Sequence, residues 1–133
     1  MARWAETAVQ RAIGQLLEVY EQQGKLLWWP VPNGSFIAGR DASERARRVA
    51  KMKSDRMLRP GVWDICILLR HGQLCIIEVK AGANGLTPEQ RAFRDRAHEF
   101  GAGWAICRSV DEAKTEVDAW VARYDRQPLA RAS

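Results

Sequence analysis

Residues 62–80 of the chain read VWDICILLRHGQLCIIEVK. Two apolar runs, Val62 to Leu69 and Leu74 to Lys80, flank the short segment Arg70-His71-Gly72. Runs of Ile, Leu and Val on both sides of a glycine-containing break predict an antiparallel hairpin with a three-residue loop, in which Gly72 takes the left-handed position. Pro60-Gly61 breaks the chain just before it. This hairpin supplies two strands of the expected sheet.

The hairpin loop also fixes which side chains oppose each other. Counting back from residues 70–72 along both strands places Asp64 opposite Glu78, with Cβ atoms ~5 Å apart. Side chains alternate along a strand, so Lys80 shares the face of Glu78. Two adjacent carboxylates repel, and a divalent cation between them removes that cost. Hard oxygen ligands suit Mg²⁺ or Mn²⁺, so the sequence predicts a cation site at Asp64 and Glu78, beside Lys80.

Hydrophobic spacing and helix-end signals place the remaining elements. The expected helices span residues 2–22, 42–54, 87–100 and 110–124. The expected further strands span residues 25–31 and 104–107, with Pro30 favouring an edge position or a strand end. The order helix, strand, helix, strand, strand, helix, strand, helix predicts an α/β fold, a small mixed sheet of about four strands flanked by helices.

Two polar side chains of the expected helices point toward the sheet. On a helical wheel, Glu6 is centred on the apolar face that Ile13 and Leu17 define, where charges are rare without a partner. A first-turn acid also complements the helix dipole, so this alternative stays open. Gln90 completes a capping box with Thr87, which explains it locally. It also shares a helix face with Phe93, so both roles are compatible.

Length and composition restrict the class of protein. A chain of 133 residues, 47% apolar and 28% charged, predicts one globular domain over residues 1–125 and a loose tail over 126–133. We expect no membrane span and no secretory signal. Three widely spaced cysteines argue against a disulfide framework or a CxxC zinc site and favour a reducing intracellular setting. Cys66, Cys75 and Cys107 are expected in the core, and His71 and His98 on the surface.

The net charge of +5 lies in one stretch, residues 40–59, while the rest of the chain is neutral. A local basic excess of this kind indicates a polyanion partner, most often nucleic acid. A solvated basic helix without a partner is the alternative. The candidate phosphate-binding residues are Arg40, Arg45, Arg47, Arg48, Lys51, Lys53, Arg56 and Arg59.

The order of these motifs resembles the PD-(D/E)xK nuclease superfamily, and more specifically the VRR-NUC family. The resemblance covers most of the chain. It rests on Glu6 in the first helix, Pro32-Asn33-Gly34, the basic stretch, Gly61-Val62-Trp63-Asp64, Glu78-Val79-Lys80 and Leu86-Thr87-Pro88-Glu89-Gln90. Trp63 departs from the family, which often has Pro directly before the Asp, and the stretch after Asn33-Gly34 is longer than expected.

The resemblance implies a restriction-endonuclease-like core and metal-dependent hydrolysis of DNA phosphodiesters. Asp64, Glu78 and the Val79 carbonyl would hold Mg²⁺ or Mn²⁺, and Lys80 would orient water or stabilise developing charge. Glu6 would complete a second metal site or hold a water on the metal. Gln90 would position Lys80 or the water.

Stand-alone family members of this size resemble junction-resolving enzymes, which implies a homodimer cutting Holliday junctions inside the cell, in cytoplasm or nucleoid, of phage or bacterial origin. Leu27, Trp28, Trp29 and Trp63 could supply an apolar interface, with at least two of them expected in the core. The alternatives are a flap- or end-directed nickase or exonuclease, a non-catalytic nucleic-acid-binding module, and an interaction domain without nucleic acid.

Overall fold

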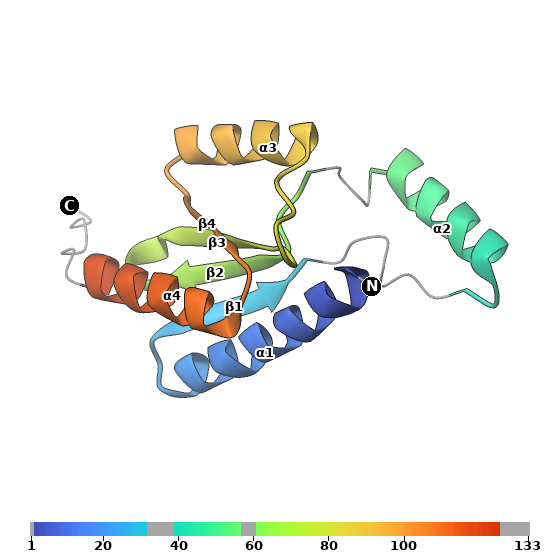
Figure 1. The fold of residues 1–133 in the computed structure, drawn as a ribbon. Helices are drawn as coiled ribbons and strands as arrows, with labels where there is room; N and C mark the ends of the chain where they lie inside the picture. Colours follow the sequence, from blue (N-terminus) through green and yellow to red (C-terminus); the bar gives the residue numbers. More distant parts are fainter. Residues whose placement is uncertain (1, 32–38, 57–60, 126–133) are drawn as a thin grey trace.

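The computed structural model describes residues 2–31, 39–56 and 61–125. The expected turn at residues 32–34, the candidate Arg59, Pro60 and the expected tail at 126–133 lie outside the described residues. Within them, the chain forms four α-helices and one four-stranded sheet (Figure 1). The predicted α/β class and element order are confirmed.

The hairpin forms with the predicted register. Strands β2 (Ile65–Leu69) and β3 (Leu74–Val79) are antiparallel and pair Leu68 with Leu74. The observed register ends at Ile65 and Ile77, and the side chains of the next residues, Asp64 and Glu78, share a hydrogen bond, as their predicted proximity requires. The loop Arg70–Gly72 is a single 3₁₀ turn in which Gly72 is left-handed (φ 78°). His71 is left-handed too (φ 67°), which the sequence reading did not predict.

The sheet has the order β1-β2-β3-β4. Strand β1 (Leu26–Pro30) is antiparallel to β2 and forms one edge, as Pro30 indicated. Strand β4 (Gly103–Cys107) is parallel to β3 and forms the other edge. Because the Val31 N–H donates to the Asp64 carbonyl, the backbone of alternate residues, including Pro30, faces away from β2. The missing N–H of Pro30 therefore costs no sheet hydrogen bond.

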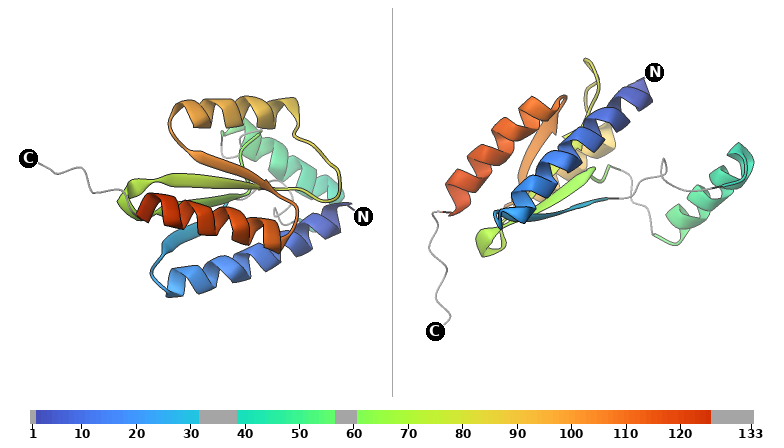
Figure 2. Two further views of the ribbon diagram at one scale, coloured as in Figure 1. Left: turned by 60° about the vertical axis from the view of Figure 1, so that its left-hand side comes forward. Right: turned by 90° about the horizontal axis from the view of Figure 1, so that it is seen from below.

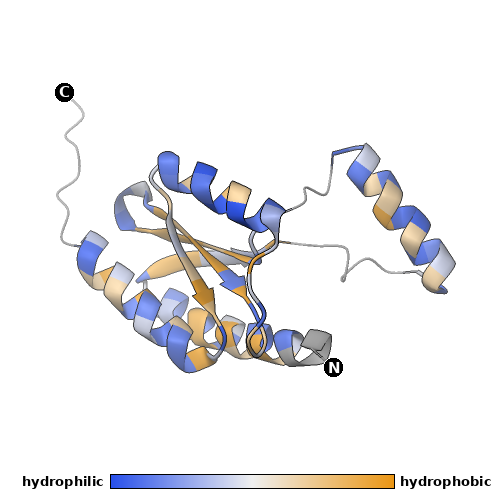
Figure 3. Ribbon diagram, turned by 45° about the horizontal axis from the view of Figure 1, so that its top comes forward, coloured by the Kyte–Doolittle hydropathy of each residue, from blue (hydrophilic) through white to orange (hydrophobic). Residues whose placement is uncertain are grey.

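Helices cover both faces of the sheet (Figures 1 and 2). Helices α1 (Ala2–Gln22) and α4 (Val110–Asp125) pack on one face, and α3 (Pro88–Glu99) lies over the other. The apolar residues concentrate in the strands, as Figure 3 shows by hydropathy. The main core lies between the sheet and the α1–α4 layer, because alternate strand residues such as Ile67 and Ile77 are fully buried there.

The α1 face is as predicted, with Ile13 and Leu17 fully buried. The spacing in α4 predicts an apolar face of Val110, Ala113, Val117, Val121 and Tyr124. Of these, Ala113 and Val117 are buried, and Val121 and Tyr124 pack partly buried against the core, while Trp120, outside the predicted face, is buried as well. Trp120 is buried because the small residue Gly103 on β4 leaves room for its indole ring. The three cysteines are buried and free, and both histidines are exposed, as expected.

Helix α2 (Ala42–Ser54) stands apart from the sheet, as Figure 1 and the right view of Figure 2 show. It contains no buried residue. Its ends are defined by local chemistry, since the Asp41 carboxylate caps the first turn and basic residues occupy the last one. None of the helices in the described ranges is long and apolar enough to cross a membrane.

We predict that Gly103→Ala destabilises the fold by about 1–3 kcal/mol. A Cβ atom there would lie 2.6 Å from the Cys75 sulfur and 3.3 Å from the Trp120 indole nitrogen, both in the core. Urea unfolding followed by circular dichroism measures the loss. Gly85→Ala is the matched control, because a Cβ at Gly85 meets nothing within 4 Å. Equal midpoints for the two variants would contradict this account of the β4–α4 contact.

Candidate active site

Asp64 is held at the point where three strands' ends meet. Its carbonyl accepts from Val31 N–H and its own N–H donates to the Ile77 carbonyl. Its side chain turns toward β3, where one carboxylate oxygen accepts the Val79 N–H at 2.8 Å. Burial raises the pKa of Asp64, and this hydrogen bond acts in the opposite direction. The Asp64 backbone is thus fixed on both sides by main chain, and its carboxylate is oriented by the Val79 N–H and by a hydrogen bond with the Glu78 side chain.

Glu78 is the more deeply buried acid of the pair, with 4% of the residue exposed. It shares a hydrogen bond with Asp64 and accepts another from the Gln90 side-chain amide at 2.6 Å. Burial, followed by the negative charge of Asp64, raises the pKa of Glu78 to about 9. Glu78 therefore keeps its proton at neutral pH. Gln90 points toward the sheet, where it contacts Glu78, and the Thr87 capping box is present as well. The role of Gln90 toward Lys80 or a water stays a prediction.

Lys80 and Glu6 complete the charged cluster. Lys80 is 9% exposed, and its positive charge lowers the pKa of both carboxyl groups. Its N–H donates to the Cys107 carbonyl, which ties the end of β3 to β4. Glu6 accepts the Ala81 N–H at 3.4 Å, and its negative charge raises the pKa of Asp64 and Glu78. The four residues predicted from three separate segments therefore gather at one end of the sheet.

The start of α3 is fitted against the segment that leads to Asp64. Gly61 has φ 80°, and a Cβ there would lie 2.4 Å from the Glu89 carbonyl oxygen. Only glycine allows this approach. Trp63 packs edge-on against Phe93 of α3, with ring centroids 4.8 Å apart. Trp63 therefore packs the segment before β2 against α3, the helix from which Gln90 reaches Glu78.

Two arginines near the site were missed by the sequence reading. Arg108 follows β4 directly and donates to the Gly82 carbonyl at 2.8 Å, and Arg91 donates to the Leu86 carbonyl at 3.4 Å. Both hold the loop that connects Lys80 to α3. Arg108 reaches this loop because β3 and β4 are parallel, which brings the C-terminal ends of both strands to one edge of the sheet. That pairing was not predicted.

The basic residues of the 40–59 stretch lie on or beside α2, outside the carboxylate cluster. Arg40, Arg45, Arg47, Arg48, Lys51, Lys53 and Arg56 are exposed or half-buried, and Arg59 lies outside the described residues. Arg40 and Arg48 bind Glu44, and Lys51 binds Asp55. Helix α2 lies on the side of the sheet where the N-terminal ends of α1 and α3 converge (Figures 1 and 2).

The donor chemistry of the carboxylate pair fits a hard divalent cation. Asp64 and Glu78 offer oxygen atoms only, the donors that hard cations prefer. Burial, and after it the repulsion from the negative charge of Asp64, raises the pKa of Glu78. A cation would relieve that repulsion, and the Val79 carbonyl is adjacent. Within the described ranges, no three His, Cys, Asp or Glu side chains are already arranged as a metal-binding group. Glu6 as a further ligand stays a prediction.

Comparisons with known proteins bear on the fold. No protein-family model matches the sequence, and no curated protein matches it. Among solved structures, the chain is similar to a VRR_NUC domain, with a TM-score of 0.54 and 18% sequence identity over 90% of this chain and 97% of that chain. At this identity the likeness establishes the fold. The fold that the resemblance implied is therefore confirmed.

We predict that Glu78→Gln stabilises the metal-free protein at pH 8. The folded state raises the pKa of Glu78, so the native carboxyl keeps a proton that the unfolded chain releases above its ordinary pKa of 4.5. Stability is therefore lost as pH rises from about 4.5 toward 9. Glutamine does not titrate, can accept from Gln90 and can donate to Asp64. Thermal unfolding in EDTA should show a gain of ~1 kcal/mol or more at pH 8 and little difference at pH 4. A variant that is less stable at both pH values would refute this.

Proposed function

We propose that the protein is a metal-dependent, structure-selective DNA endonuclease that resolves Holliday junctions. The observation that supports this most strongly is the buried Asp64–Glu78 pair with Lys80 on the same strand. Three charged groups at the buried end of an apolar sheet are costly for folding alone, and they suit phosphodiester hydrolysis. The similarity of the chain to a solved VRR_NUC domain supports a nuclease. The basic helix α2 agrees with a polyanionic substrate.

The residues of the site would divide the chemistry between them. Asp64, Glu78 and the Val79 carbonyl would hold Mg²⁺ or Mn²⁺, which supplies polarisation of the scissile phosphate and a lowered pKa of water. The Lys80 ammonium would orient the attacking water or stabilise charge that develops on the phosphate oxygens. Gln90 keeps Glu78 in place through its 2.6 Å hydrogen bond. Glu6 would hold a second cation or a water at the end of α1.

The basic residues of α2 would bind DNA through its phosphates. They lie outside the catalytic cluster, so they would fix the orientation of the duplex and carry no base readout. Their phosphate contacts should make binding salt-dependent. An enzyme with this substrate would work inside the cell, in the cytoplasm or nucleoid.

Symmetric cutting of a four-way junction needs two active sites, so we propose a homodimer with two-fold symmetry. The structure divides the four candidate interface residues into two groups. Trp28 and Trp63 are half-buried and pack within the fold, as expected for at least two of the four. Leu27 and Trp29 are 56% and 42% exposed, and they lie on the same side of β1. These two are the candidates for contact with a second copy.

The first test is cleavage of a labelled four-way junction and a matched linear duplex with Mg²⁺, Mn²⁺ or EDTA. We expect paired, metal-dependent cuts in the junction. Asp64→Asn and Lys80→Ala should each reduce the rate by at least about 100-fold, as loss of a preorganised charged group does. Thermal unfolding with and without Mn²⁺ gives a readout independent of catalysis. The cation should raise the midpoint of the wild type more than that of Asp64→Asn.

The outcomes separate the alternatives. Equal cutting of both substrates would retain a nuclease and remove the junction preference. Cuts confined to flaps or ends would favour a nickase or exonuclease. Salt-sensitive binding without cleavage under any metal, unchanged in both variants, would leave a binding module and overturn the catalytic proposal.

We predict that Gly61→Ala reduces cleavage by at least about 10-fold. The new Cβ would meet the Glu89 carbonyl and displace the start of α3, which carries Gln90 away from Glu78. Gly101→Ala is the matched control, because Gly101 also has a positive φ but a Cβ there meets nothing within 4 Å. Both variants carry backbone strain of about 1–2 kcal/mol, so similar rates in the two would show that the Gly61 contact does not position the site.

A further inference from the structure

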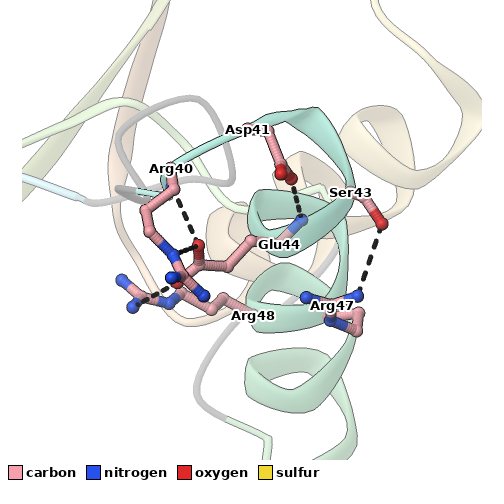
Figure 4. A network of polar contacts seen from close by, with 6 residues as sticks. All are labelled: Arg40, Asp41, Ser43, Glu44, Arg47 and Arg48. Carbon is pink, nitrogen blue, oxygen red and sulfur yellow. Dashed lines mark hydrogen bonds and ion pairs between the residues drawn. The ribbon is translucent and has the colours of Figure 1, made fainter.

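Glu44 lies between two arginines at the first turn of α2, as Figure 4 shows. One of its carboxylate oxygens accepts from Arg40 twice, from the backbone N–H at 3.0 Å and from Nε at 2.7 Å. The other accepts from the Arg48 guanidinium at 2.8 Å. The helix turn itself is fixed separately, because the Asp41 side chain accepts the Glu44 N–H at 2.8 Å. Glu44 thus accepts a hydrogen bond from the Arg40 main chain and also binds the side chains of both Arg40 and Arg48.

Exposure shows which way this group faces. The Glu44 side chain is only 13% exposed, whereas those of Arg40 and Arg48 are 88% and 55% exposed. The arginines therefore cover the acid and present the outer surface. Their hydrogen bonds lower the pKa of Glu44, with the Arg40 side chain as the largest cause. The unit carries a net positive charge that two ordered guanidinium groups display.

The other acid–base pair of the helix is organised differently. Lys51 binds Asp55 at 2.9 Å one turn from the C-terminal end, and both side chains are largely exposed, 77% and 51%. One acid neutralises one base there, and among the described residues of that turn Asp55 forms an ion pair with Lys51 alone. Glu44 within the helix and Asp55 at its C-cap carry equal charge, but of these two described acids only Glu44 binds two arginines.

We propose that Glu44 is a positioning residue for DNA binding, which holds Arg40 and Arg48 in place to receive phosphates of the DNA backbone. This inference rests on the proposed function. A guanidinium group has five N–H donors in a planar fork, so an arginine bound to a carboxylate on one side can still bind phosphate with another. An arginine that is already ordered loses less side-chain entropy on binding. Removal of Glu44 should therefore weaken DNA binding, although it removes a negative charge.

Loss of a negative charge alone would strengthen DNA binding, whereas loss of the positioning role would weaken it, and the test measures which of the two occurs. Binding of the full chain to a labelled four-way junction and to a duplex is measured in EDTA, which prevents cleavage, over a range of salt concentrations. Glu44→Gln should bind about 3- to 10-fold more weakly than the wild type. Asp55→Asn removes the same charge from the C-cap of the same helix and should bind equally well or up to about 2-fold more tightly. Arg40→Ala with Arg48→Ala should lower the slope of log K against log salt by about 1.8, or ~0.9 per phosphate contact.

A second background excludes general damage to α2. In the Arg40→Ala, Arg48→Ala protein, adding Glu44→Gln should cause no further loss, because Glu44 acts through those arginines. A further loss there would assign Glu44 to helix stability and overturn the proposal. Tighter binding by Glu44→Gln, equal to that of Asp55→Asn, would overturn it as well, while leaving the nuclease proposal intact. A wild type without salt-sensitive DNA binding would overturn the proposed function itself and this inference with it.

Discussion

The arrangement of the site depends on one constraint, the pairing of two carboxylates across a hairpin whose register cannot shift. The loop at residues 70–72 sets the alignment of β2 and β3, and a slip by one residue would turn Asp64 or Glu78 to the opposite face. Fully buried side chains such as Ile67 and Ile77 oppose such a slip. The core therefore holds the two carboxyl groups together, and burial first and the negative charge of Asp64 second raise the pKa of Glu78.

Helix α3 and the chain before β2 convert this pair into a site with defined geometry. Gly61 lets the two segments approach, Trp63 and Phe93 pack them together, and Gln90 binds Glu78. A close backbone approach, an aromatic contact and a hydrogen bond thus together hold the Gln90 amide nitrogen against Glu78. By contrast, α2 contains no buried residue and is ordered by contacts within its own turns. The contacts that hold Arg40 and Arg48 therefore lie at the first turns of α2 and not in the core.

Local signals made most of the fold predictable. The hairpin register, the Thr87 capping box and the face of α1 follow from spacing and turn chemistry, and so does the pairing of Asp64 with Glu78. The misses arose where tertiary packing decides. Trp120 is buried because Gly103 leaves space for it, and Arg108 reaches the site loop because β4 runs parallel to β3. Neither relationship is encoded within a short window of sequence. The positive φ of His71 likewise departs from residue preference.

The outer edge of β1 has a consequence for how copies of this chain can meet. The backbones of Leu26, Trp28 and Pro30 face outward there, but Pro30 has no N–H and the Trp28 N–H donates to the Glu21 carboxylate at 3.3 Å. Two of these three positions therefore offer no donor to an incoming strand. The sheet cannot readily be extended into a continuous intermolecular one at this edge. The two missing donors disfavour the addition of strands at this edge, including the stacking of strands that leads to fibrous aggregation.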